Sequence, residues 1–99
     1  MNEPLPSFPS LQELAIEIGM DLQRSRKKFV LAESCTGGLA SGTLATVPGM
    51  SNSMCGSFVV YTEGAKKSWL GIPDALLQEV GVVSRETAEA MAKRALEMT

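Results

Sequence analysis

The chain of 99 residues contains no histidine. This absence excludes a Ser-His-Asp triad, a Cys-His pair and any histidine-ligated zinc site formed within the chain. Cysteine is scarce too: Cys35 and Cys55 lie far apart and form no Cys-x-x-Cys motif. Such cysteines are typical of reduced thiols in a cytoplasmic protein, so we expect a cytoplasmic location.

Long apolar runs and an excess of basic residues are also missing. No stretch reaches the roughly 18 apolar residues that span a membrane, and the N-terminus has no basic segment of a signal peptide. The formal net charge is −2, and the short basic run over residues 24–28 is typical of the end of a helix. We therefore expect no membrane and no nucleic-acid partner.

What remains is the composition of one soluble globular domain, with 44% apolar and 20% charged residues. We predict an extended arm over residues 1–9, which contains three prolines, and a single domain over residues 10–99. Ser10 and Glu13 form a capping box that begins a helix. Apolar residues then recur on one face of that helix, at Leu11, Leu14, Ala15, Ile18 and Leu22.

The middle of the chain predicts a strand, a helix and a second strand. Lys28–Ala32 is a short apolar run typical of a strand buried on both faces, Leu39–Thr46 is compatible with a helix, and Ser57–Tyr61 is the second strand. Further helices are predicted over residues 63–70, 73–80 and from an N-cap at Ser84 onward. We expect an α/β fold with a βαβ core, flanking helices and an incomplete sheet, because two parallel strands are not stable alone.

The turn after the first strand is the first candidate site. Ligands of α/β sheets bind beyond the carboxyl ends of the strands, and glycines let a backbone approach an anion. The candidate substrate-binding residues are Ser34, Cys35, Thr36, Gly37 and Gly38. An ordinary turn with a capping hydroxyl explains the same pattern. A reactive Cys35 thiol at a helix start, serving a redox protein, is a weaker interpretation.

The second candidate site consists of Ser51, Tyr61 and Lys66, because a lysine can activate a serine hydroxyl without histidine. Tyr61 ends the second predicted strand, and Lys66 lies about one helical turn into the next segment. An exposed loop serine, a half-buried tyrosine and a surface lysine would give the same spacing.

Together these motifs resemble the CinA C-terminal domain, the nicotinamide-nucleotide amidohydrolase (PncC-type) family. The matching segments are Ala32–Gly38 (AESCTGG), Val47-Pro48-Gly49 with Ser51, Phe58–Tyr61, Ala65-Lys66, Leu70-Gly71 and Gly81–Ser84. Gly49-Met50-Ser51 stands where the family has Gly-Ser-Ser. The family domain continues into further strands beyond the last predicted helix, so the resemblance implies a truncated domain.

The resemblance implies hydrolysis of the carboxamide of nicotinamide mononucleotide to nicotinic acid mononucleotide and ammonia. Ser51 would be the nucleophile, Tyr61 and Lys66 its activating partners, and the turn Ser34–Gly38 part of the nucleotide pocket. No metal and no cofactor is implied. The alternative is a catalytically silent module that binds a nucleotide or a partner protein. We also expect a homo-oligomer, because open strand edges and a thin helix face are costly to expose.

Overall fold

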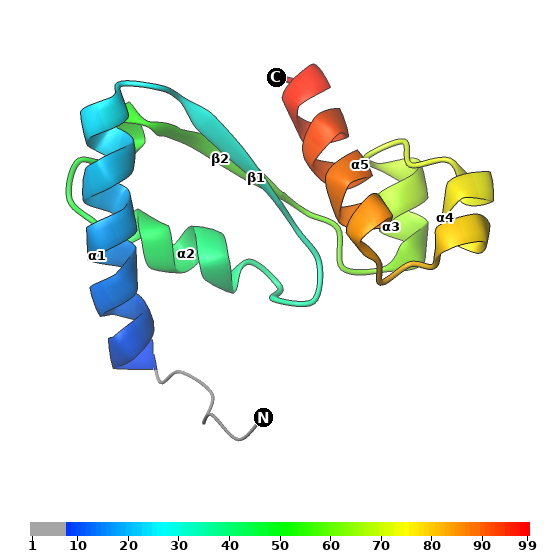
Figure 1. The fold of residues 1–99 in the computed structure, drawn as a ribbon, viewed down its shortest axis with the longest axis horizontal. Helices are drawn as coiled ribbons and strands as arrows, with labels where there is room; N and C mark the ends of the chain where they lie inside the picture. Colours follow the sequence, from blue (N-terminus) through cyan, green and yellow to red (C-terminus); the bar gives the residue numbers. More distant parts are fainter. Residues whose placement is uncertain (1–7) are drawn as a thin grey trace. The chain divides into compact units, whose positions relative to one another are not determined.

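A strand, a helix and a second, parallel strand follow one another in the chain, as predicted. The computed structural model describes residues 8–99. Backbone hydrogen bonds run from Phe29 N to Ser53 O and from Val60 N to Glu33 O, so both strands advance in the same direction. The elements are α1 (Phe8–Ser25), β1 (Phe29–Glu33), α2 (Leu39–Ala45), the 3₁₀ helix η1 (Met50–Asn52), β2 (Met54–Val59), α3 (Glu63–Ser68), α4 (Asp74–Val80) and α5 (Arg85–Glu97) (Figure 1). The α/β prediction is confirmed.

The chain divides into two compact units, which we describe separately. Unit 1 comprises the residues up to Phe29 together with Leu39–Cys55, and unit 2 comprises Val30–Gly38 and Gly56–Thr99. Each strand therefore begins in unit 1 and ends in unit 2. The predicted arm falls largely outside the described residues, and the single-domain organisation over residues 10–99 stays a prediction.

Unit 1 is built on the contact of α1 with α2 and η1, and α1 and α2 lie side by side (Figure 1). Its buried core consists of Ala15, Val47 and Met50, with Leu22, Phe29, Leu44 and Met54 packed against them. A Cβ at Gly19 would lie 3.0 Å from the Val47 side chain, so the absence of a side chain allows this close approach. No helix in the described part of the chain is long and apolar enough to cross a membrane.

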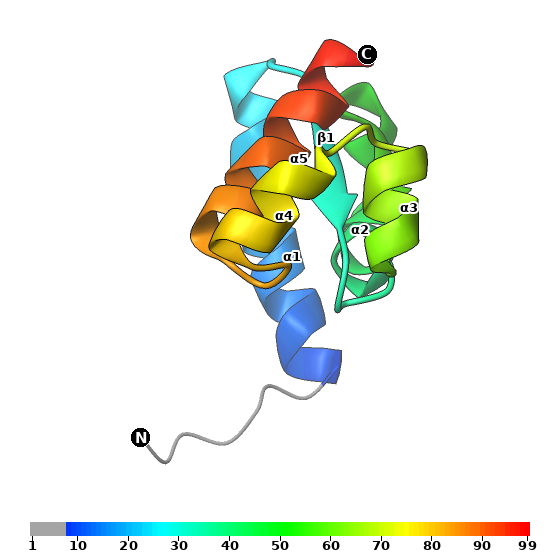
Figure 2. The same cartoon turned by 90° about the vertical axis from the view of Figure 1, so that its right-hand side faces the viewer.

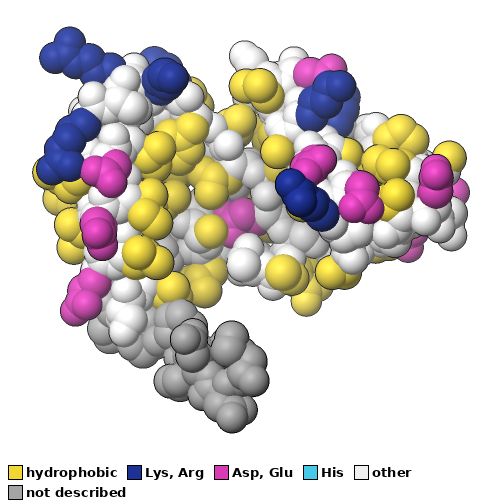
Figure 3. Space-filling model, in the orientation of Figure 1, with side chains coloured by type: hydrophobic (Ala, Val, Ile, Leu, Met, Phe, Trp, Pro, Cys, Tyr) yellow, Lys and Arg dark blue, Asp and Glu magenta, His cyan; other side chains and the backbone are white. Residues whose placement is uncertain are grey.

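Helix α1 buries less of its apolar face than the sequence predicts. Ala15 is buried, but Leu14 is 50% exposed and Ile18 is 42% exposed, because the short α2 and η1 cover only part of the helix. Acidic side chains lie along α1 and basic ones gather near its C-terminal end (Figure 3). This is the charge order that suits the helix dipole at its C-terminus.

Gly49 has a backbone conformation that favours glycine. Its φ is 82°, and an added Cβ would lie 2.6 Å from Gln23 Oε1. We expect Gly49→Ala to lower the free energy of unfolding by about 1–3 kcal/mol. Gly42, in α2, has open space around it, so Gly42→Ala should raise the free energy of unfolding by about 0.5–1 kcal/mol. Urea unfolding of both variants is the measurement, and equal effects of the two would contradict the prediction.

Unit 2 has its core among α3, α4 and α5, which are labelled in Figure 2. The buried residues are Val60, Ala65, Leu70, Ile72, Leu77 and Met91. The predicted cap of the last helix is confirmed, since Ser84 Oγ accepts a hydrogen bond from Thr87 N. Thr87 Oγ1 in turn donates to Gly81 O at 2.6 Å, which holds the α4–α5 connection to the start of α5.

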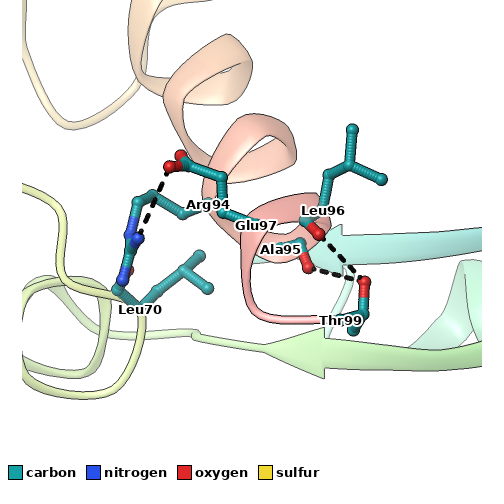
Figure 4. Close-up of polar contacts among 6 residues, drawn as sticks. All are labelled: Leu70, Arg94, Ala95, Leu96, Glu97 and Thr99. Carbon is teal, nitrogen blue, oxygen red and sulfur yellow. Dashed lines mark hydrogen bonds and ion pairs between the residues drawn. The ribbon is translucent and has the colours of Figure 1, made fainter.

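The turn after α3 is joined to α5 by Arg94. Its Nε donates to Leu70 O at 2.8 Å, and its Nη1 lies 3.9 Å from Glu97 Oε2 (Figure 4). A Cβ at Gly71 would lie 3.0 Å from Arg94 Nη2, and the φ of Gly71 is 74°. Glycine at position 71 therefore permits both the turn and the approach of the guanidinium group.

An exposed ion pair joins α3 to α4 in unit 2. The hydrogen bond from Lys67 Nζ, 3.0 Å from Asp74 Oδ1, and the attraction between the charges lower the pKa of Asp74 and raise the pKa of Lys67. The stabilisation from Asp74 is thus present at neutral pH and is lost as the pH falls through its lowered pKa. We expect Asp74→Asn to lower the melting temperature slightly at pH 7, with the difference vanishing in acid. Thermal unfolding followed across pH checks this, and a pH-independent difference would contradict it.

Several predicted boundaries were wrong. Helix α1 begins at Phe8 rather than Ser10, because proline at position 9 is tolerated in the first helical turn. Strand β1 begins and ends one residue later than predicted, and β2 spans Met54–Val59 rather than Ser57–Tyr61. The residues Phe29–Ala32 are half-buried, so β1 is not buried on both faces. In the described residues each strand has one neighbour, which leaves its other edge uncovered by a strand.

Candidate active site

The turn Ser34–Gly38 follows β1 directly, at the place the sequence predicts. Gly37 and Gly38 have φ values of 61° and 100°, a region that glycine occupies without strain. Gly37 N donates a hydrogen bond of 2.9 Å to Ser34 O, which closes the turn. The glycines therefore let the chain reverse sharply where β1 ends.

Lys66 is the buried cation of unit 2, with 3% of its surface exposed. Thr62 caps α3 by accepting a hydrogen bond from Ala65 N, and Lys66 lies one turn after this cap, with its backbone N bonded to Thr62 O at 3.0 Å. Lys66 Nζ donates to Ser34 Oγ at 2.7 Å, to Val60 O at 3.1 Å and to Tyr61 O at 3.3 Å. An ammonium group has three donors, so these acceptors satisfy it fully.

Glu33, the last residue of β1, is a buried carboxylate with 5% of its surface exposed. Its Oε1 accepts a hydrogen bond of 2.6 Å from Thr36 Oγ1, and its Oε2 lies 3.4 Å from Ser57 Oγ. Its backbone oxygen accepts from Val60 N at 2.8 Å. Glu33 thus joins the end of β1 to the following turn and to β2.

Ser51 lies in unit 1, on the 3₁₀ helix η1, and is exposed. It lines a hollow of about 350 Å³ together with Val47, Pro48, Gly49, Met50 and Met54, among others. Gln23 Nε2 donates to Pro48 O at 3.1 Å and so ties this loop to α1. The hollow presents the Ser51 hydroxyl to solvent beside apolar side chains.

The predicted site residues thus fall in both units. Ser34 and Lys66 are brought together in unit 2, while Ser51 belongs to unit 1, so its role with Tyr61 and Lys66 stays a prediction. Tyr61 contacts Lys66 through its backbone oxygen, which accepts a hydrogen bond from Lys66 Nζ. Its side chain is 66% exposed and lines, with Val59 and Trp69, a hollow of about 490 Å³ in unit 2. Cys35 is an exposed free thiol.

Two features of the site were not predicted from the sequence. The first is the hydrogen bond of Lys66 to Ser34, which joins residues 32 positions apart. The second is Glu33, whose signal was visible as a lone carboxylate between an apolar run and hydroxyl residues. Within the described residues, no group of three or more acidic or cysteine side chains forms a metal-binding set.

The contact of Lys66 with Ser34 can support acyl chemistry. As an amine, a lysine keeps two N–H donors, enough for Val60 O and Tyr61 O, and its lone pair can accept the Ser34 hydroxyl proton. A serine that loses its proton to a neighbouring base becomes a nucleophile. The same three contacts therefore serve both protonation states of the lysine.

Comparison with known proteins points to one family. The family model described as CinA C-terminal domain matches residues 11–99. A CinA-like protein of Myxococcus xanthus is 49% identical over 72 residues, which cover 73% of this chain and 17% of that protein. Another CinA-like protein, from Solibacter usitatus, is 43% identical over 79 residues, which cover 80% of this chain and 19% of the other. The chain spans about a fifth of the length of these curated relatives.

Solved structures show the same similarity in three dimensions. The competence/damage inducible protein CihA from Agrobacterium tumefaciens matches with a TM-score of 0.81 and 38% identity, over 98% of this chain and 58% of that one. A CinA superfamily protein from Escherichia coli matches with a TM-score of 0.85 and 26% identity, over 100% of this chain and 61% of that one. The fold described above is therefore shared with these structures over nearly the whole chain.

Proposed function

The chain belongs to the CinA C-terminal domain family, and from this premise we propose that it hydrolyses the carboxamide of nicotinamide mononucleotide. The products are nicotinic acid mononucleotide and ammonia. The observation that carries the proposal is the 2.7 Å contact between the buried Lys66 Nζ and Ser34 Oγ. A buried lysine against a serine hydroxyl is one arrangement that supports amide hydrolysis in a chain without histidine.

In the proposed reaction the Ser34 oxygen attacks the carboxamide carbon while its proton passes to the Lys66 amine. Lys66 then returns this proton to the departing nitrogen, which leaves as ammonia. Water hydrolyses the acyl-serine ester, and its proton returns to the serine oxygen by way of Lys66. The resemblance described above assigns the nucleophile to Ser51 instead, and that assignment stays a prediction to be tested beside Ser34.

The surroundings of the contact support a nucleotide as the substrate. The turn Ser34–Gly38 exposes backbone amides of a glycine-rich segment, which suits a phosphate or a developing oxyanion. The hollow beside Tyr61 and Trp69 has the volume of a small-ligand site, and exposed aromatic side chains offer a face to a planar ring. We propose that the substrate lies across these two features, without a metal or cofactor.

The test is to incubate the protein with nicotinamide mononucleotide and to measure ammonia release. Release of one ammonia per nicotinic acid mononucleotide formed supports the proposal. Absence of release, together with nucleotide binding measured by calorimetry, would replace it with the alternative of a catalytically silent binding module. The observation that favours this alternative is that the three contacts of Lys66 already satisfy its ammonium form.

Two further expectations accompany the proposal. Cys35 and Cys55 are free cysteines, which supports a location in the reducing cytoplasm. Exposed large apolar residues on α1 support the prediction of a homo-oligomer: Leu14, Ile16, Ile18 and Met20.

We expect the protein to self-associate, and Ile18→Glu to shift it toward the monomer, because Leu14 and Ile18 are exposed one turn apart on the same side of α1 and a charge there would disfavour burial. Light scattering across a range of concentrations is the measurement. Glu17→Gln, at a neighbouring exposed position, is the control. A wild-type protein that stays monomeric throughout would contradict the prediction.

A further inference from the structure

The turn Ser34–Gly38 is held by two buried ionisable groups. Lys66 holds it through Ser34 Oγ at 2.7 Å, and this contact belongs to the proposed chemistry. Glu33 holds it through Thr36 Oγ1 at 2.6 Å, and the proposed chemistry makes no use of this contact. The carboxylate is buried at 5% exposure, although its partner Thr36 is exposed.

Burying a carboxylate is costly unless hydrogen bonds satisfy it. Thr36 and Ser57 supply such bonds, and the shorter of the two goes to the turn. A hydroxyl bonded to a charged acceptor makes a strong hydrogen bond, so Thr36 is drawn toward the strand end. Gly37 and Gly38 are flexible residues that need an external constraint to hold one conformation.

We propose that Glu33 is a positioning residue: through Thr36 it fixes the turn in the conformation that presents Ser34 and the Gly38 amide to the nucleotide. This inference rests on the proposed function for its consequence in catalysis. The inference that the Glu33–Thr36 hydrogen bond orders the turn does not depend on catalysis, and a separate experiment tests it.

The first experiment measures amide hydrogen exchange of Gly37 and Gly38 in the full chain. Thr36→Val removes the hydroxyl at an exposed position, so the variant should fold, and we expect exchange in the turn to rise roughly tenfold. Ser57→Ala is the matched control, because it removes a second hydroxyl partner of the same carboxylate and leaves the residues of the turn unchanged. Unchanged turn exchange in Thr36→Val, or an equal rise in both variants, would overturn the proposal.

The second experiment measures KM and kcat for nicotinamide mononucleotide. We expect Thr36→Val to raise KM or lower kcat roughly tenfold, whereas Ser57→Ala leaves both constants unchanged. Glu33→Gln should retain most of the activity, because its amide oxygen can accept from Thr36 and its NH₂ can donate to Ser57 Oγ. When Glu33→Ala and Thr36→Val are combined in one chain, their effects on KM and kcat should not add, because both remove the same hydrogen bond.

The two proposals fail in different ways. A wild-type protein that neither binds nor hydrolyses the nucleotide contradicts the proposed function, and the exchange experiment still decides on Glu33. A wild-type protein that hydrolyses the nucleotide, with kinetic constants unaltered by Thr36→Val, overturns the role of Glu33 alone.

Discussion

Replacement of Lys66 by methionine is expected to abolish amide hydrolysis and to weaken the fold. The variant keeps an unbranched side chain of similar size but removes the donor that now bonds Ser34 Oγ, Val60 O and Tyr61 O, and of these atoms Ser34 Oγ and Tyr61 O keep their mutual contact of 3.4 Å. Loss of the proton acceptor should lower the rate roughly a thousandfold. The lost hydrogen bonds should lower the free energy of unfolding by about 2 kcal/mol, since a buried unsatisfied group costs about 1–3 kcal/mol and removal of the buried charge offsets part of this cost.

The neighbouring Lys67 supplies the control. It bonds Asp74 on the surface, so Lys67→Met should leave hydrolysis unchanged and alter stability only slightly. Lys66→Arg separates charge from proton transfer, because an arginine donates hydrogen bonds but does not give up its proton. Ammonia release and urea unfolding are the two measurements. A Lys66→Met enzyme with wild-type turnover would remove the lysine from the proposed chemistry.

Local signals were sufficient to predict most helices. Ser84 as a cap, and the start of α2 at Leu39, follow from nearby residues, so the sequence revealed them. The ends of the strands were less accurately predicted, because the alignment of β1 with β2 sets them. The Phe29–Ser53 and Glu33–Val60 contacts that define this alignment join distant residues.

In the candidate site, too, features set by nearby residues were predicted and features set by distant residues were not. The glycine turn was predicted because hydroxyl residues and glycines follow an apolar strand, and Lys66 was predicted as a partner that activates a serine. Its burial and its bond to Ser34 were not predicted, since they depend on how α3 packs against the ends of the strands. Glu33 was overlooked for a related reason. A single carboxylate at a strand end is usually exposed, and hydrogen bonds such as those from Thr36 and Ser57 help to make its burial tolerable.

Replacement of Ser34 by alanine is the second change with a large expected effect. Ser34 Oγ is the hydroxyl that Lys66 Nζ contacts, at 2.7 Å, so Ser34→Ala should lower the rate of hydrolysis roughly a thousandfold. The melting temperature should change little, because Lys66 keeps Val60 O and Tyr61 O as acceptors. Nucleotide affinity measured by calorimetry should change less than the rate, since the glycine amides of the turn remain.

Ser51→Ala is the decisive companion variant, because the two serines lie in different units and differ in their surroundings. Ser51 is exposed beside a hollow of about 350 Å³, so its loss should leave folding intact and isolate its chemical role. If Ser34 is the nucleophile, rapid mixing should show no acyl-enzyme burst in Ser34→Ala and a burst in Ser51→Ala. The reverse pattern would give the nucleophilic role to Ser51, as the resemblance implies, and would leave Ser34 as the residue that anchors Lys66 to the turn.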